Sequence, residues 1–136
     1  MNRNSDIIAL TETRLNTNTV ANIDIQGYDF YHNDSDTMAG GTGLYVKKEL
    51  DAVQLTDINL NLQQVESCWI EIKSQNSCIV IGCIYRHPSA DIAEFSETLE
   101  TVIEQINANG RQVFLVGDFN IDFLKIENHP PTENYV

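Results

Sequence analysis

Positive charge is scarce in this sequence. Its 136 residues include 8 Lys and Arg against 20 Asp and Glu, which gives a formal net charge of −12. A protein that holds nucleic acid tightly usually carries a basic patch, because contacts with phosphates dominate the affinity. Here only Lys47 and Lys48 are adjacent. The composition therefore argues mildly against tight nucleic-acid binding, but it does not exclude a metal-dependent phosphodiesterase, whose centre needs carboxylates.

Long hydrophobic runs are also missing. No stretch approaches the roughly 18 apolar residues that cross a bilayer, so an integral membrane protein is not expected. Residues 1–10, MNRNSDIIAL, have no apolar signal core, so secretion is not expected either. The content of 42% hydrophobic and 21% charged residues is typical of a globular chain. The length of 136 residues fits one ordinary domain or a piece of a larger one.

Cysteine is rare, and its spacing excludes two kinds of site. Cys68, Cys78 and Cys83 are odd in number and contain no Cys-x-x-Cys pair. A zinc site and a disulfide framework are therefore not expected. The three side chains are predicted to be reduced, buried thiols of an intracellular protein.

Most of the chain reads as β-strands. Residues 64–74, QVESCWIEIKS, alternate, with Cys68, Ile70 and Ile72 on one face and Trp69, Glu71 and Lys73 on the other. Residues 78–85, CIVIGCIY, are apolar on both faces and predict a central strand. The other expected strands are residues 6–13, 28–34, 42–50 and 52–58 as a pair, and 111–122.

One helix is predicted between residues 90 and 110. Asp91 can cap its start, with Glu94 three residues later, and Gly110 lies just past its end. Strands with one helix fit an α/β or α+β layered domain and exclude an all-helical fold. The apolar residues of the helix fall on one stripe at spacings of three and four, namely Ile92, Phe95, Leu99, Val102, Ile103 and Ile106.

Three expected strands end in polar side chains. Glu12 ends IIALTE, Tyr85 ends IVIGCIY, and Asp118 and Asn120 end VFLVGDFN, with Asp122 beyond. In layered α/β proteins, functional sites gather where such strand ends converge. Two carboxylates, an amide and a phenol suit a hard cation such as Mg²⁺ bound to a phosphate. The Asp-x-Asn spacing would place two side chains on one face of the strand, able to hold a water and a phosphate oxygen.

Each of these features also has a plain structural explanation. A glutamate after an apolar strand is usually a surface residue, and Tyr85 alone is more often a packing residue. The letters GDFN favour a turn by themselves. The prediction of a site rests on the three features occurring together in this order.

The blocks DIIALTETRL, GGTGLYVKK, ESCWIEI, IVIGCIYRHPS and VFLVGDFNID together closely resemble the endonuclease/exonuclease/phosphatase superfamily. Among its members they are most similar to the apurinic-type endonuclease domains of non-LTR (LINE-like) retrotransposons. The resemblance covers residues 6–134, almost the whole chain. It implies a four-layer α/β sandwich of the DNase I-like type, Mg²⁺ with Mn²⁺ as a substitute, and DNA as the substrate. It also implies a reverse transcriptase domain in the same polyprotein and a nuclear location.

The resemblance implies a role for each residue of the site. Glu12 matches the glutamate that ligates the metal, and Tyr85 matches the tyrosine that contacts the scissile phosphate. Asp118 matches the aspartate that positions or deprotonates the attacking water. Asn120 matches the asparagine that orients this aspartate and stabilises the transition state.

The chain also departs from the family pattern. Members usually begin with one more strand that carries an asparagine near the metal, and they end with a Ser-Asp-His block. Neither is present, and His32, His87 and His129 lie in other contexts, although His87 follows Tyr85 closely enough to face the same cleft mouth. Residues 1–136 are therefore expected to form a partial domain, roughly the first half of the fold. We expect such a piece to expose apolar surface and to be inactive by itself.

Three alternatives remain at this point. The first is a phosphatase or phosphodiesterase of the same superfamily that acts on inositol phosphates or lipid headgroups. The second is a non-catalytic relic. A nucleotide-binding loop at AGGTG, residues 39–43, fits less well, because a dinucleotide fingerprint opens a helix whereas these glycines lead into a β-type stretch. Gly40, Gly41 and Gly43 are predicted to serve a turn and the entry to a strand.

Overall fold

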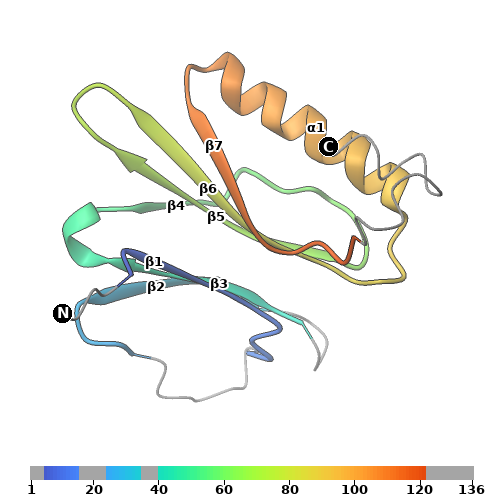
Figure 1. Ribbon diagram of the computed structural model, residues 1–136, viewed down its shortest axis with the longest axis horizontal. Helices are drawn as coiled ribbons and strands as arrows, with labels where there is room; N and C mark the ends of the chain where they lie inside the picture. Colours follow the sequence, from blue (N-terminus) through green and yellow to red (C-terminus); the bar gives the residue numbers. More distant parts are fainter. Residues whose placement is uncertain (1–4, 16–23, 35–39, 122–136) are drawn as a thin grey trace.

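Two β-sheets pack face to face in the computed structural model, which describes residues 5–15, 24–34 and 40–121 (Figure 1). The first sheet has the strand order β1-β3-β2, and both of its strand pairs are antiparallel. Its strands are β1 (Ile7–Thr11), β2 (Tyr28–Asn33) and β3 (Thr42–Lys47).

The second sheet has the strand order β4-β5-β6-β7. The pairs β4–β5 and β5–β6 are antiparallel, whereas β7 runs parallel to β6. Parallel neighbours need a crossover connection, and helix α1 supplies it while covering the outer face of this sheet (Figure 1). The elements are a short 3₁₀ turn η1 (Lys48–Leu50), β4 (Val53–Leu55), β5 (Val65–Lys73), β6 (Cys78–Arg86), α1 (Ile92–Ala108) and β7 (Gln112–Asp118).

Strands β5 and β6 separate two hydrophobic cores, because successive side chains point to opposite faces of the sheet. Between the two sheets, Cys68 and Ile70 of β5 lie in one cluster with Ile81 and Cys83 of β6. The predicted central strand at residues 78–85 is confirmed, since β6 is buried on both faces. Under α1, the other core contains Leu60, Trp69, Val80, Ile84, Phe95, Leu99 and Ile106.

Helix α1 begins and ends as the capping pattern predicts. The Asp91 side chain accepts a hydrogen bond from the backbone N–H of Glu94 at 2.9 Å. Gly110 follows the end of the helix with a φ of +77°, which glycine adopts without strain. Phe95 and Leu99 of the predicted apolar stripe are buried against the second sheet.

Residues 42–50 and 52–58, predicted as a pair of strands, each contain a strand, but the two strands do not pair with each other. Strand β3 belongs to the first sheet and β4 to the second, and each pairs with other strands. The turn η1 and Asp51, which has a left-handed φ of +52°, redirect the chain between the two sheets. Local periodicity identifies strands but does not determine their partners.

The prediction of a buried strand at residues 111–122 needs two corrections. Strand β7 ends at Asp118, so Asn120 lies beyond it, and Asp122 lies outside the described residues. Phe114 and Val116 are 53% and 36% exposed, because β7 is an edge strand of the described sheet. The expectation of exposed apolar surface is confirmed at this edge.

The layered α/β prediction is confirmed by the two sheets and the helix that covers one of them. The glycine prediction also agrees with the structure, because Gly40 and Gly41 precede β3 and Gly43 lies within it. Among the described residues, no helix is long and apolar enough to cross a membrane.

The cysteines are free thiols, as the sequence predicts, but they differ in burial. Cys68 and Cys83 are register partners on β5 and β6, and neither side chain is exposed. Burial raises the pKa of the Cys68 thiol to about 12 and that of the Cys83 thiol to about 11. Cys78 is only partly buried, so the prediction of a core thiol is wrong for that residue.

Replacing the helix cap should weaken the fold by a defined amount. Asp91→Ala removes the acceptor for the Glu94 N–H, and we expect the free energy of unfolding to fall by about 1 kcal/mol. Asp91→Asn keeps a side-chain oxygen at the cap and should cost much less. Urea unfolding followed by circular dichroism measures both variants, and equal losses would contradict the capping role.

Candidate functional site

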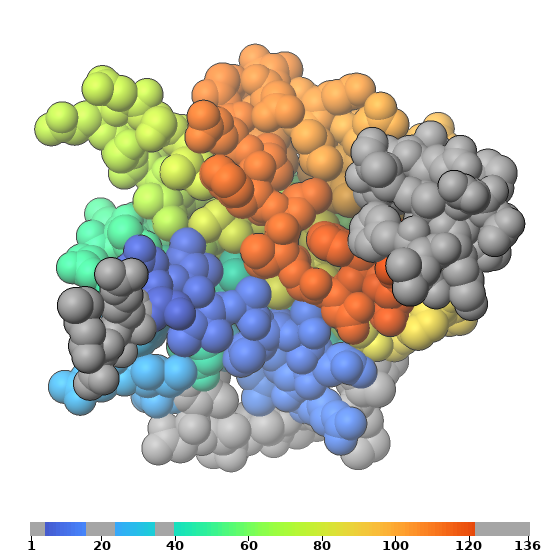
Figure 2. Space-filling view, viewed as in Figure 1, coloured from blue at the N-terminus to red at the C-terminus, as the bar shows by residue number. Residues whose placement is uncertain are grey.

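Residues from both sheets meet at one end of the molecule. Tyr85 lies on the face of β6 that points between the sheets, and Asp118 is its register partner on β7. Glu12 comes from the turn after β1, in the other sheet. The Tyr85 hydroxyl donates a hydrogen bond to Glu12 Oε1 at 3.2 Å, across 73 residues of sequence. Figure 2 shows β1 and its following turn, in blue, beside the end of β7, in orange-red.

The surroundings of Tyr85 favour its protonated form. The side chain is only 5% exposed. Burial raises the pKa of its hydroxyl, and the nearby charges of Glu12, Asp118 and Glu66 raise it further. Tyr85 therefore carries a proton at neutral pH and acts as a hydrogen-bond donor.

The turn that carries Glu12 has an unusual backbone. Glu12 and Arg14 have φ values of +54° and +58°, in the left-handed region that costs energy for residues other than glycine. Main-chain hydrogen bonds hold this turn, from Thr13 N to the Gly41 carbonyl at 3.3 Å and from Arg14 N to the Gly40 carbonyl at 2.8 Å. Gly41 itself has a φ of +104°, and a Cβ there would lie 2.2 Å from Thr13 Oγ1. The close docking of the two turns requires glycine at this position.

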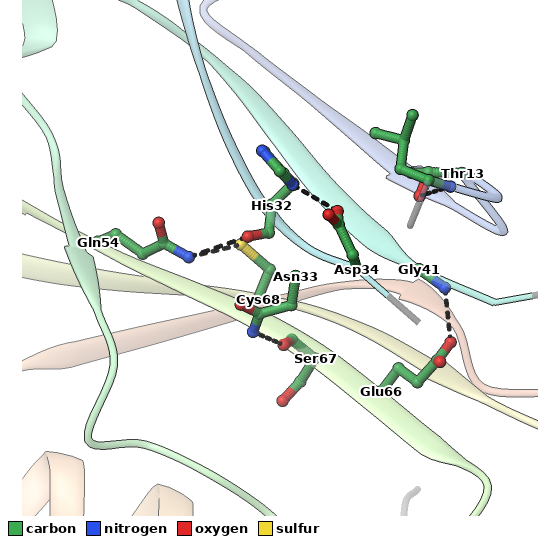
Figure 3. A network of polar contacts seen from close by, with 10 residues as sticks. Thr13, His32, Asn33, Asp34, Gly41, Gln54, Glu66, Ser67 and Cys68 are labelled. Atoms are coloured by element: carbon green, nitrogen blue, oxygen red, sulfur yellow. Dashed lines mark hydrogen bonds and ion pairs between the residues drawn. The ribbon is translucent and has the colours of Figure 1, made fainter. Parts of the chain in front are cut away.

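Glu66 supports the same turn, although the sequence analysis did not identify it as a site residue. Its Oε2 accepts a hydrogen bond from Gly41 N at 2.8 Å (Figure 3). Glu66 is also the register partner of Tyr85 on β5 and is half-buried. A signal was present in the sequence, because residue 66 falls on the same face of the alternating strand as Cys68 and Ile70. A charge on the apolar face of a strand needs a polar partner.

A polar pocket of about 510 Å³ lies next to Glu66. His32 contacts Asp34, with its Nδ1 2.6 Å from Asp34 Oδ1 (Figure 3). The His32 ring also stacks on the ring of Phe30, which lies two residues earlier on β2. The Asn33 side chain donates to the Ser67 carbonyl at 2.6 Å and ties β2 to β5. The pocket is lined by Asn33, Asp34, Leu55, Thr56, Ile58, Asn59, Val65, Glu66 and Ser67.

The Asp-x-Asn pair does not lie on one face of a strand as predicted. Asn120 has a left-handed φ of +50° beyond the end of β7. Its backbone N–H donates to Asp118 Oδ1 at 3.1 Å, whereas its side-chain amide donates to the Arg86 carbonyl at 2.5 Å. Asn120 therefore orients Asp118 through its main chain. The prediction that side chains alternate along an extended strand fails for Asn120, because Gly, Asp and Asn all favour turns.

His87 lies beside Tyr85, as its position in the sequence suggests. The two ring centroids are 4.7 Å apart in an edge-on arrangement. The backbone N–H of His87 donates to the Gln64 carbonyl at 2.8 Å, which fixes the chain just after β6. His129 lies outside the described residues.

The described residues contain no group of three or more His, Cys, Asp or Glu side chains placed to hold a metal ion. Mg²⁺ does not require such a cage, because it commonly binds through one or two carboxylates and keeps several waters. The donor set at this site is an exposed Glu12 carboxylate, the Tyr85 hydroxyl and the Asp118 carboxylate. These oxygen donors fit a Mg²⁺ ion held by Glu12 and water.

A family model described as "Endonuclease/Exonuclease/phosphatase family" matches residues 2–135 of this chain. No curated protein was found to match this chain.

Several solved structures have a similar fold. The endonuclease domain of TRAS1, a telomere-specific non-LTR retrotransposon, is 16% identical with a TM-score of 0.56, over 74% of this chain and 44% of that one. D. rerio TDP2 complexed with single-strand DNA product is 17% identical with a TM-score of 0.59, over 90% and 51%. The human Nocturnin catalytic domain with bound sulfate is 14% identical with a TM-score of 0.55, over 86% and 52%.

These similarities confirm the predicted DNase I-like fold, and at such identities they show the fold alone. The chain spans about half the length of the solved structures that it matches. The two sheets and α1 are three of the four layers expected.

The contact between Tyr85 and Glu12 can be tested by titration. Glu12→Gln removes one of the negative charges that raise the pKa of the Tyr85 hydroxyl, so this pKa should fall towards 10 while burial keeps part of the elevation. The ultraviolet difference spectrum between each protein and its Tyr85→Phe derivative isolates this tyrosine. Glu100→Gln, on the exposed side of α1, should leave the titration unchanged. An identical curve for Glu12→Gln would contradict the contact.

The support that Glu66 gives to the Gly41 turn predicts a difference between two substitutions. Glu66→Ala removes the acceptor, and because a hydrogen bond to a charged group contributes about 1.5–3 kcal/mol, the Gly41 amide should exchange at least tenfold faster. Glu66→Gln keeps a side-chain oxygen and should retain most of the protection. Hydrogen exchange followed by NMR measures both, and equal exchange in the two variants would show that the acceptor atom is not what protects Gly41.

Proposed function

Because this chain belongs to the endonuclease/exonuclease/phosphatase family, we propose that it is part of a metal-dependent phosphodiesterase that nicks DNA, as in a non-LTR retrotransposon. The observation that carries the proposal is the hydrogen bond from Tyr85 to Glu12, which joins the two sheets at the end where Asp118 also lies. The TRAS1 endonuclease domain and the DNA-bound TDP2 among the similar structures support DNA as the substrate. The proposal extends to a reverse transcriptase domain in the same polyprotein and a nuclear location.

The residues divide the chemistry between them. The Asp118 carboxylate, held by the Asn120 N–H, accepts a proton from the water whose oxygen attacks phosphorus. The Tyr85 hydroxyl keeps its proton because its pKa is raised. Its single O–H donates to Glu12 in the described structure and, when substrate binds, would turn to donate to a phosphate oxygen instead. Attack forms one P–O bond and breaks the P–O bond to the leaving sugar oxygen, which takes up a proton from solvent water as it departs.

The electrostatics of the site support a cation. The negative charges of Glu12, Asp118 and Glu66 all act on the Tyr85 hydroxyl and raise its pKa. A phosphate diester brings further negative charge to the same place. Bound Mg²⁺ would supply the charge that stabilises the phosphoryl transition state, with Glu12 as its carboxylate ligand and Mn²⁺ as a substitute.

A phosphate ester outside nucleic acid is the second candidate substrate. The net charge of −12, with only 8 Lys and Arg, favours it, because duplex DNA binding depends on phosphate neutralisation. An inositol phosphate or a lipid headgroup needs fewer basic contacts than a duplex. The site chemistry is the same for both substrates.

The proposal is tested with supercoiled plasmid and Mg²⁺, using both the 136-residue chain and a version extended by its genomic flanks. We expect the extended protein to convert plasmid to nicked circles, and chelation of the metal to abolish nicking. Glu12→Ala and Asp118→Ala should each lower the rate by about 10²-fold or more. Glu100→Ala, an exposed carboxylate on α1, is the matched control and should nick normally.

Other results would select the alternatives. Hydrolysis of an inositol phosphate without nicking would identify the second substrate class. If neither substrate is hydrolysed by an extended protein that still shows the Tyr85–Glu12 titration, the proposed function is wrong and the chain is a non-catalytic relic. The expectation that the isolated chain is inactive stays a prediction, which the plasmid assay with the 136-residue chain tests.

A further inference from the structure

Arg86 is buried directly behind the candidate site. Its neighbour Tyr85 faces the space between the sheets, and because side chains alternate along a strand, Arg86 points to the opposite, α1-covered face. The side chain is 1% exposed. Burying a guanidinium is costly unless its N–H groups have acceptors. The acceptors of Arg86 therefore indicate what this buried charge is for.

The guanidinium donates to main-chain carbonyls of two separate segments. Nε donates to the Phe119 carbonyl at 2.7 Å, and Nη2 donates to the Asn120 carbonyl at 2.6 Å. Nη1 donates to the Ala90 carbonyl at 2.5 Å, just before α1. The Asn120 side-chain amide returns a hydrogen bond to the Arg86 carbonyl at 2.5 Å. Arg86 thus binds the segment after β7 from its side chain and from its main chain.

This segment is the one that orients Asp118. Two consecutive carbonyls held by one planar group fix the peptide planes around Asn120, whose φ of +50° is unfavourable without such support. The fixed backbone directs the Asn120 N–H at Asp118 Oδ1, 3.1 Å away. Phe119 adds a packing contact, with its ring centroid 6.3 Å from that of Phe95.

We propose that Arg86 is a positioning residue for the candidate site, which acts through the backbone of residues 119–120 to hold the carboxylate of Asp118. The role depends on the fork of the guanidinium, because Nε, Nη1 and Nη2 each reach a different carbonyl from one rigid plane, whereas lysine has all three N–H donors on one nitrogen at the end of a flexible chain. The effect on catalysis rests on the proposed function, whereas the effect on the Asn120 backbone does not.

A merely structural role for Arg86 would have a different signature. Its bond to the Ala90 carbonyl joins β6 to the start of α1, so loss of the guanidinium also weakens the fold as a whole. Global weakening speeds exchange of the most protected amides throughout the protein, whereas loss of positioning acts first on one amide next to the site. Hydrogen exchange, residue by residue, therefore separates the two roles.

The test compares Arg86→Lys with wild type in the full chain, by hydrogen exchange and NMR. Lysine keeps the charge and most of the length, so the variant is chosen to stay folded. We expect the Asn120 amide to exchange at least tenfold faster, while amides in the middle of β5 and α1 change less than twofold. Arg111→Lys is the matched control, because Arg111 is paired with Glu71 at 2.9 Å on the second sheet and contacts no part of residues 118–120 in the described hydrogen bonds.

A second variant approaches the same contact from the other side. Asn120→Gly removes the side-chain bond to the Arg86 carbonyl, tolerates a positive φ, and leaves the guanidinium in place. We expect faster exchange at position 120 again, by a smaller factor. If Arg86→Lys fails to fold, this variant still decides: a rise of tenfold or more at position 120 would overturn the proposal, because it would show that the Asn120 side-chain bond, and not the guanidinium that remains in place, fixes this backbone.

Kinetics test the consequence in whichever form of the protein nicks DNA. Arg86→Lys should lower kcat by tenfold or more with KM and the Mg²⁺ requirement unchanged, because Glu12 and Tyr85 are not held by the guanidinium. Unchanged kcat, or exchange that rises equally at all protected amides, would overturn the positioning role. Local loss of protection in a protein without any nuclease activity would confirm the positioning and refute only the proposed function.

Discussion

The burial of β6 on both faces is the constraint on which the rest of the structure depends. Ile81 on one face joins the two sheets, and Val80 on the other lies under α1, so this strand cannot shift without breaking both cores. The same alternation continues to the end of the strand. There it sends Tyr85 between the sheets to meet Glu12 and sends Arg86 behind the sheet to hold the segment after β7. Tyr85 of the site and Arg86, which supports it, are adjacent in sequence because β6 is buried on both faces, and each face holds one of the two side chains.

Much of this arrangement could be predicted from local pattern. The alternation around Trp69, the apolar run of β6 and the cap at Asp91 each depend on residues within a few positions, and each agrees with the structure. The candidate residues Glu12 and Tyr85 were identified because polar side chains ended apolar strands, and the structure brings these two into contact. Their roles in catalysis remain proposals.

The remainder depends on contacts between distant segments. The partners of β3 and β4 follow from how the chain turns at Asp51, which periodicity does not encode. Glu66 is not predicted as a site residue because the alternation of its strand is ordinary. Its charge on the apolar face of that strand is nevertheless a signal in the sequence. The left-handed backbone of Asn120 depends on Arg86, 34 residues away, so a reading of GDFN as a strand end could not anticipate it.

The paired cysteines give this protein a chemical reporter of its own packing. Only thiolates react readily with alkylating reagents, and Cys68 and Cys83 combine complete burial with a pKa well above neutral. Both sit where the two sheets meet, and Cys83 donates to the Leu10 carbonyl of β1 at 3.4 Å. The pKa of the Cys78 thiol is also raised, but Cys78 is partly accessible at the far end of β6 and would be modified while the fold is intact. The number of thiols that an alkylating reagent labels would therefore show whether the two sheets are packed together. One thiol per chain would be labelled when they are packed, and three when they separate.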